Sequence, residues 1–170
     1  CDWSSDVCSS DLPDGYTLLY GISALVLRQF LVKDIPYDVL RDFTPIAQLG
    51  STTFGILQNN DVPANNLREF IDYAKRNPGK LSYASAGNGT TQHLAGFLLE
   101  REAGIEMIHV PYKSEAQSVP DLLAGRVHLL ITTTSSVTPL VRAGKAKFLT
   151  VVSPNRFEAF PEVPATVELL

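Results

Sequence analysis

The hydrophobic pattern of this chain changes repeatedly between two periods along residues 54–152. Short apolar runs, which are typical of buried strands, alternate with segments whose apolar residues fall at helical spacing. The clearest helix begins after Asn66, where Glu69 three residues later completes a sequence that resembles a capping box, and Pro78-Gly79 ends it. Its apolar positions, at i, i+3, i+4 and i+7, are Leu67, Phe70, Ile71 and Ala74.

The remaining elements follow from the same pattern. We expect further helices from Thr90 to Gly104, up to Gly125, and from Ser136 to Gly144, with Pro120 producing a kink or a new helix start. The expected strands cover residues 43–49, 54–58, 81–85, 106–110, 127–132 and 147–152. Strands that alternate with helices predict an α/β architecture with parallel pairing and right-handed crossovers.

The N-terminal apolar run, Leu18–Leu27, is shorter than the roughly 20 residues that a membrane helix needs. It is therefore interpreted as a buried strand and the turn after it. Aromatic residues along the chain are interpreted as core residues, namely Tyr16, Tyr20, Phe43, Phe54, Phe70, Tyr73 and Phe97.

The segment 81–111, LSYASAGNGTTQHLAGFLLEREAGIEMIHVP, carries the most distinctive chemistry. A strand passes through Gly87 and Gly89 into a helix that Thr90 or Thr91 can cap, and the chain then returns as a strand. The helix is expected to turn Leu94, Ala95, Leu98 and Leu99 toward the core. The unpaired N–H groups and the positive end of such a helix favour a carboxylate or a phosphate.

Charge excludes several classes of partner. The chain has 14 Lys and Arg against 18 Asp and Glu, without a basic stripe for nucleic acid or a polybasic patch for membranes. Residues 1–12, CDWSSDVCSSDL, resemble a translated sequencing adapter and are set aside as foreign to the protein. They contain both cysteines and three of the acidic residues, so the rest of the chain is nearly neutral and has no cysteine.

Several further motifs occur in a specific order. They are PDGYTLLYG at 13–21, DFTPIAQLG at 42–50, HVPYK at 109–113, DLLAGRV at 121–127, RAGKAKFL at 142–149 and FPEVPATVEL at 160–169. Together with segment 81–111, they closely resemble the Bug-type family, the extracytoplasmic substrate-binding proteins of tripartite tricarboxylate transporters. The resemblance extends from about Pro13 to the last residue.

The resemblance implies a type II periplasmic-binding-protein-like fold, in which two lobes with mainly parallel sheets and flanking helices enclose the ligand. Residues 13–60 would form part of lobe one, 61–150 lobe two, and 151–170 a segment that returns toward lobe one. The chain would then be a fragment that lacks the N-terminal part of lobe one and the C-terminal helices.

The resemblance also implies where the ligand binds. In the family, the turn and helix start that correspond to residues 85–91 hold a ligand carboxylate. Tyr112 and Lys113 follow a strand end, where open α/β sheets bind ligands, and Thr132–Ser136 form a hydroxyl cluster at the next edge. The expected ligand-binding residues are Ser85, Ala86, Gly87, Gly89, Thr90, Thr91, Tyr112, Lys113, Thr133 and Thr134.

Some positions depart from the family pattern. Ser114 stands where the family usually has glycine, His128 replaces a frequent aspartate, and the hydroxyl cluster lacks the acidic or amide residue common near that strand end. Ligand choice is therefore expected to differ. His93 is interpreted as a packing or capping residue and His109 and His128 as packing or solvent-facing, and no metal site or cofactor is expected.

These observations predict a periplasmic solute-binding protein, not an enzyme. It would be a monomer when complete, capture a small carboxylate and deliver it to the membrane permease subunits of a transporter. An α/β enzyme fragment with a nucleotide- or anion-binding turn at 85–91 remains an alternative, although GNGTTQ at 87–92 lacks the third glycine of a dinucleotide fingerprint. A soluble carboxylate sensor on the same fold is the other alternative.

Overall fold

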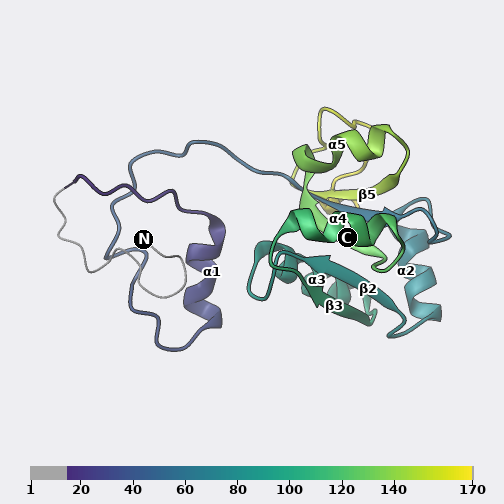
Figure 1. Ribbon diagram of the computed structural model, residues 1–170, viewed down its shortest axis with the longest axis horizontal. Coiled ribbons are helices and arrows are strands. Elements are labelled where there is room, and N and C mark those ends of the chain that lie inside the picture. The colour runs from purple at the N-terminus through teal and green to yellow at the C-terminus, as the bar shows by residue number, and fades with distance from the viewer. Residues whose placement is uncertain (1–14, 170) are drawn as a thin grey trace. The chain divides into compact units, whose positions relative to one another are not determined.

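The chain divides into two compact units, residues 1–50 and residues 51–170 (Figure 1). A computed structural model describes residues 15–169. The prediction that residues 1–12 are foreign to the protein lies outside the described residues. No helix within the described part of the chain is long and apolar enough to cross a membrane.

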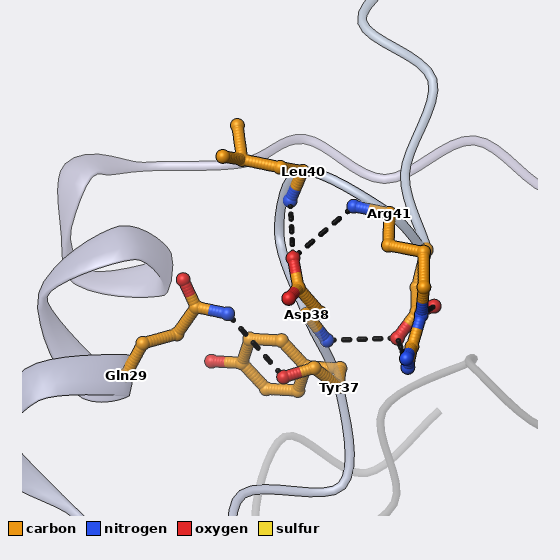
Figure 2. A network of polar contacts seen from close by, with 6 residues as sticks. Gln29, Tyr37, Asp38, Leu40 and Arg41 are labelled. Carbon is orange, nitrogen blue, oxygen red and sulfur yellow. Dashed lines mark hydrogen bonds and ion pairs between the residues drawn. The ribbon is translucent and has the colours of Figure 1, made fainter.

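The first unit contains one helix, α1 (Ser23–Leu31), among its described residues, followed by a hydrogen-bonded loop. The Tyr37 hydroxyl donates to the carbonyl of Leu25 in α1 over 3.1 Å. The Asp38 carboxylate then accepts the backbone N–H groups of Leu40 and Arg41 at 2.9 and 3.1 Å, which closes a tight turn (Figure 2). These contacts link the helix to the loop that follows it.

Three sequence predictions for this unit are wrong. Residues 23–31 form a helix where a buried strand was expected to end in a turn, and residues 43–49 form no strand. Tyr16 and Tyr20 are 91% and 66% exposed, so they are not core residues. A strand needs a neighbouring strand for its backbone hydrogen bonds, whereas a helix satisfies its own. No strand occurs in the described residues of this unit to supply such a partner.

The second unit is built on a five-stranded sheet whose strand order is β3-β2-β4-β1-β5. The strands are β1 (Phe54–Asn59), β2 (Leu81–Ser85), β3 (Met107–Pro111), β4 (Leu129–Thr133) and β5 (Ala146–Val152). β2 pairs in parallel with β3 and β4, whereas β1 pairs antiparallel with β4 and β5. Parallel pairing is thus confirmed for β2, β3 and β4, and β1 is the strand that opposes the others.

Helices cover both faces of this sheet. They are α2 (Leu67–Arg76), α3 (Thr91–Ala103), α4 (Glu115–Leu123) and α5 (Thr134–Arg142), and a 3-10 turn, η2 (Thr166–Glu168), follows β5. Neighbouring strand residues point to opposite faces. Tyr83 therefore packs with residues of α2 and α3, whereas the next residue, Ala84, packs with residues of α4 and α5. The result is the two-sided α/β arrangement that the alternating pattern predicts.

The predicted helix boundaries agree with the structure to within two residues. Asn66 caps α2 by accepting the N–H of Glu69 at 2.9 Å, and Gly104 ends α3 with a left-handed φ of 62°. α4 runs through Pro120 without a new start, so of the two predicted alternatives, a kink or a fresh helix, the fresh helix does not occur. α5 begins at Thr134, two residues before the expected Ser136.

The buried face of α3 differs from the predicted one. Its buried residues are Gln92, Gly96, Leu99 and Ala103. Of the predicted apolar face, only Leu99 is fully buried; Leu98 is 38% exposed, and Phe97, expected in the core, is 52% exposed. Glycine contributes nothing to a hydrophobic pattern, so the sequence could not reveal that the buried stripe passes through Gly96.

Candidate functional site

The sheet topology brings the predicted site segments to one edge. The parallel strands β2, β3 and β4 end at Ser85, Pro111 and Thr133. The antiparallel strand β1 starts at the same edge, because Phe54 pairs with Thr133. The carboxyl ends of parallel strands are where open α/β sheets bind ligands.

The turn between β2 and α3 is held by its own side chains. The Ser85 hydroxyl oxygen accepts the N–H of Gly87 at 3.1 Å, and the Thr90 hydroxyl donates to the carbonyl of Gly87 over 2.8 Å. Gly87 and Gly89 have φ values of 119° and 75°, which side-chain-bearing residues rarely adopt. The turn therefore depends on both glycines.

Thr90 is the helix cap. Its hydroxyl oxygen accepts the N–H of His93 at 3.3 Å, and its extended backbone precedes Thr91, the first residue of α3. Of the two threonines that could cap the helix, the structure thus selects Thr90. Thr91 lies in the first turn of α3, where helix N–H groups and the positive helix end favour an anion.

Two histidines, His93 and His109, contact this turn and support it. The sequence analysis did not include them in the site. The imidazole of His109 stacks between the rings of Tyr83 and His93, with centroid distances of 4.9 and 4.2 Å. His109 Nε2 lies 2.7 Å from the Ser85 hydroxyl, and His93 Nδ1 accepts the N–H of Gly89 at 3.2 Å. His93, interpreted as a packing or capping residue, and His109, interpreted as a packing or solvent-facing one, both pack here, and the group they support is the glycine turn.

Burial lowers the pKa of His109, and the neighbouring His93 lowers it further. Burial also lowers the pKa of His128, whose Nδ1 lies 3.1 Å from the backbone nitrogen of Ser82. Both histidines are thus kept neutral in the folded protein more strongly than in the unfolded chain.

This linkage predicts that the folded state loses stability in mild acid. When the pKa of a histidine is lower in the folded state than its unfolded value of about 6.5, its neutral form contributes fully to the free energy of unfolding above about pH 6.5. This contribution is lost as the pH falls through the folded pKa. The free energy of unfolding, measured with urea at pH 7.5 and 5.5, should decrease at the lower pH. The decrease should be smaller in His109→Gln; an equal decrease in both proteins would contradict the prediction.

The second predicted group, Tyr112 and Lys113, follows β3. The Tyr112 N–H donates to the carbonyl of Ser85 over 3.0 Å, so this loop lies against the glycine turn. The Tyr112 hydroxyl donates to Asp121 over 2.7 Å, and burial first, then this contact, raises the pKa of Tyr112 to about 12. The Tyr112 hydroxyl therefore donates its proton to a residue of α4. Lys113 is exposed, and it belongs to none of the ion pairs of the described residues.

The third group, the hydroxyl cluster after β4, is divided between two roles. Thr134 is buried, and its hydroxyl donates to the carbonyl of Thr53 over 3.2 Å, which ties α5 to the start of β1. Thr133 instead donates to the Glu115 carboxylate over 3.1 Å, and the Ser136 hydroxyl donates to the same oxygen, Oε1. Glu115 was missed by the sequence reasoning. Its position at the start of the helix after β3 was the available signal.

Two hollows of about 350 and 290 Å³ lie elsewhere in the second unit, and the predicted site residues line neither. The larger lies between α2 and α3 beside Leu169, and the smaller is lined by Thr53 and residues 153–158. Within residues 15–169, no group of three His, Cys, Asp or Glu side chains could hold a metal ion.

An α/β unit with an anion-favouring glycine turn at its carboxyl edge occurs in several classes of protein, and the solved structures that this chain resembles are periplasmic ones. The chain resembles a structure described as a periplasmic transporter, with 32% identity, a TM-score of 0.85, and coverage of 95% of this chain and 54% of that one. It also resembles a protein of R. palustris solved with adipate, with 31% identity, a TM-score of 0.74, and coverage of 80% and 46%.

Sequence comparison gives the family. Residues 4–170 match the profile of the tripartite tricarboxylate transporter family receptors, and the chain belongs to this family. A UPF0065 protein of Pseudomonas sp. (strain P51) is 36% identical over 164 residues, which are 96% of this chain and 49% of that protein. The chain thus spans about half the length of the curated relatives it matches. The resemblance deduced from the sequence motifs is confirmed.

Proposed function

We propose that this chain forms part of an extracytoplasmic receptor that captures a small carboxylate and delivers it to the membrane components of a tripartite tricarboxylate transporter. The observation that carries the proposal is the glycine turn at residues 85–91. It places the N-terminus of α3 at the carboxyl edge of the sheet and is braced by Ser85, Thr90 and two histidines. The adipate in the R. palustris relative supports a carboxylate as the ligand class.

The turn suits a carboxylate for physical reasons. The N–H groups at the start of a helix and the helix dipole attract negative charge, and a hydroxyl in the first turn can add a charge-assisted hydrogen bond. Lys113, exposed just after β3, supplies a positive charge on the loop that contacts the turn. The ligand-binding set is proposed to centre on Ser85, Ala86, Gly87, Gly89 and Thr91, with Lys113 and Thr133 at the neighbouring strand ends.

The proposed mechanism is the closure of two lobes around the ligand. Residues 13–60 would belong to lobe one, 61–150 to lobe two, and 151–170 would return toward lobe one. A closed, ligand-bound form would differ in surface from the open form, which is the difference that a permease can recognise. The receptor would act in the periplasm as a monomer, without a cofactor and without catalysis.

The first-turn threonine provides the test. In the full-length protein, Thr91→Ala should weaken carboxylate binding by about 10-fold to 150-fold, because a hydrogen bond to a charged group is worth about 1.5 to 3 kcal/mol. Thr90→Ala should instead remove the helix cap and lower the free energy of unfolding by about 1 kcal/mol. Binding would be measured by calorimetric titration with the tightest binder from a thermal-shift screen of acetate, malate, adipate and 4-aminobutanoate.

Thr91→Ser is the matched control, because it keeps the hydroxyl and should retain affinity within a few-fold. Unchanged affinity in Thr91→Ala would remove this helix start from the binding site. Consumption of the carboxylate during the titration would support an enzyme in place of a receptor.

A further inference from the structure

The proposed anion-binding edge contains an anion of the protein's own. The Glu115 carboxylate accepts hydrogen bonds from the hydroxyls of Thr133 and Ser136 through one oxygen, Oε1. Each of these hydroxyls has a single proton to donate. The Thr133 hydroxyl also lies 2.9 Å from Ser136 Oγ, and the Ser136 hydroxyl lies 2.8 Å from the carbonyl oxygen of Thr133. The donors of this strand end are thus already paired within the protein, and the Glu115 carboxylate is one of their acceptors.

The position of Glu115 in the fold favours its negative charge. It is the first residue of α4, where the helix dipole attracts an anion, and its side chain is only partly exposed. The ion pairs among residues 15–169 involve Asp42, Glu102, Asp121 and Glu168, and Glu115 is in none of them. Its charge is therefore not balanced by a contacting lysine or arginine.

The strand order brings Glu115 to the strand end next to the glycine turn. Its partner Thr133 ends β4, and Ser85, where the turn begins, ends β2, the adjacent parallel strand. Neighbouring strands lie about 5 Å apart, and because Ala84 pairs with Leu130, Thr133 lies two residues, or about 7 Å, beyond the level of Ser85. The two strand ends are therefore about 8 Å apart, a separation that a small organic acid of several carbons spans. One end of the ligand would then meet the helix N-terminus of α3, and the other would meet Glu115.

We propose that Glu115 makes this receptor select monocarboxylates whose far end donates hydrogen bonds, such as a hydroxyl or an ammonium group, and reject dicarboxylates. This inference rests on the proposed function, since it assigns the second half of the same site. A second carboxylate at the far end would face a like charge and would find the hydroxyls of Thr133 and Ser136 occupied. An ammonium or hydroxyl group would instead donate to the free oxygen of Glu115, Oε2.

Matched pairs of compounds test the selection. Calorimetric titration of the full-length protein would compare succinate with 4-aminobutanoate and adipate with 6-aminohexanoate, which differ at one end only; 4-hydroxybutanoate adds a neutral donor. The wild-type protein should bind each amino acid at least about tenfold more tightly than its dicarboxylate partner. In Glu115→Gln, which keeps the shape but removes the charge, this ratio should shrink by about tenfold or more.

Glu106→Gln is the control variant. It removes the same charge from an exposed residue at the opposite, amino end of β3, and it should leave the ratio unchanged. Circular dichroism would show that each variant is folded. Preferential binding of the dicarboxylates by the wild-type protein, or the same ratio in Glu115→Gln, would overturn the role of Glu115 while leaving the receptor function intact. A folded protein that binds none of the five compounds and no other small carboxylate would overturn both.

Discussion

Gly96→Val is expected to lower the free energy of unfolding by about 3 kcal/mol or more, because it places side-chain atoms inside a buried ring. A Cβ atom at position 96 would lie 2.2 Å from Cε2 of Tyr83 and 2.7 Å from its Cδ2 and Cζ. Tyr83 is 1% exposed, and its ring is stacked against His109, so it cannot move aside without disturbing the histidines that brace the glycine turn.

Urea unfolding of both proteins measures this effect. Phe97→Val is the matched control, because it introduces the same β-branched residue at the next position of α3, where the native side chain is 52% exposed. It should cost less than about 1 kcal/mol. Equal losses in the two variants would show that helix propensity, and not the contact with Tyr83, explains the effect.

Leu99→Ala is expected to lower the free energy of unfolding by about 2 to 5 kcal/mol. Leu99 is 3% exposed and packs in the cluster that joins α2, α3 and the sheet, so its removal leaves a cavity. The sequence pattern assigned this role to Leu94 as well, but Leu94 is only partly buried.

Leu94→Ala therefore serves as the comparison, with an expected cost well below that of Leu99→Ala. Denaturant midpoints with a common m-value would give both numbers. A Leu94→Ala variant that is as unstable as Leu99→Ala would mean that the buried stripe of α3 is the one the apolar pattern predicted. It would also contradict the packing described for Gly96.

The sequence predicted the second unit far better than the first. In residues 51–169 each helix lies close to its expected position, because caps such as Asn66 and C-terminal glycines such as Gly104 act locally. In residues 15–50 the apolar run was assigned as a strand, and the structure has α1. Apolar runs of that length do not distinguish a strand from a helix, and the partner strand that would decide between them is absent from the described residues of that unit.

The candidate site shows the same division. The glycine turn was evident from the sequence, because Gly87, Gly89 and Thr90 are adjacent in the chain and each has a local physical role. The braces of the turn were not evident, since His109 reaches Ser85 only after β3 pairs with β2. Glu115 was missed for a similar reason, because its contacts with Thr133 and Ser136 join α4 to the end of β4.

By itself, then, the sequence determined the family, the alternation of strands and helices, and the glycine turn, because these depend on short-range order along the chain. Only the tertiary structure decided that β1 runs antiparallel to its neighbours and that α3 packs through Gly96. It also decided that Glu115 accepts a hydrogen bond from the Thr133 hydroxyl at the end of β4. These features join residues that are distant in the sequence. Packing and hydrogen bonding between elements fix such contacts, and local propensity carries no record of them.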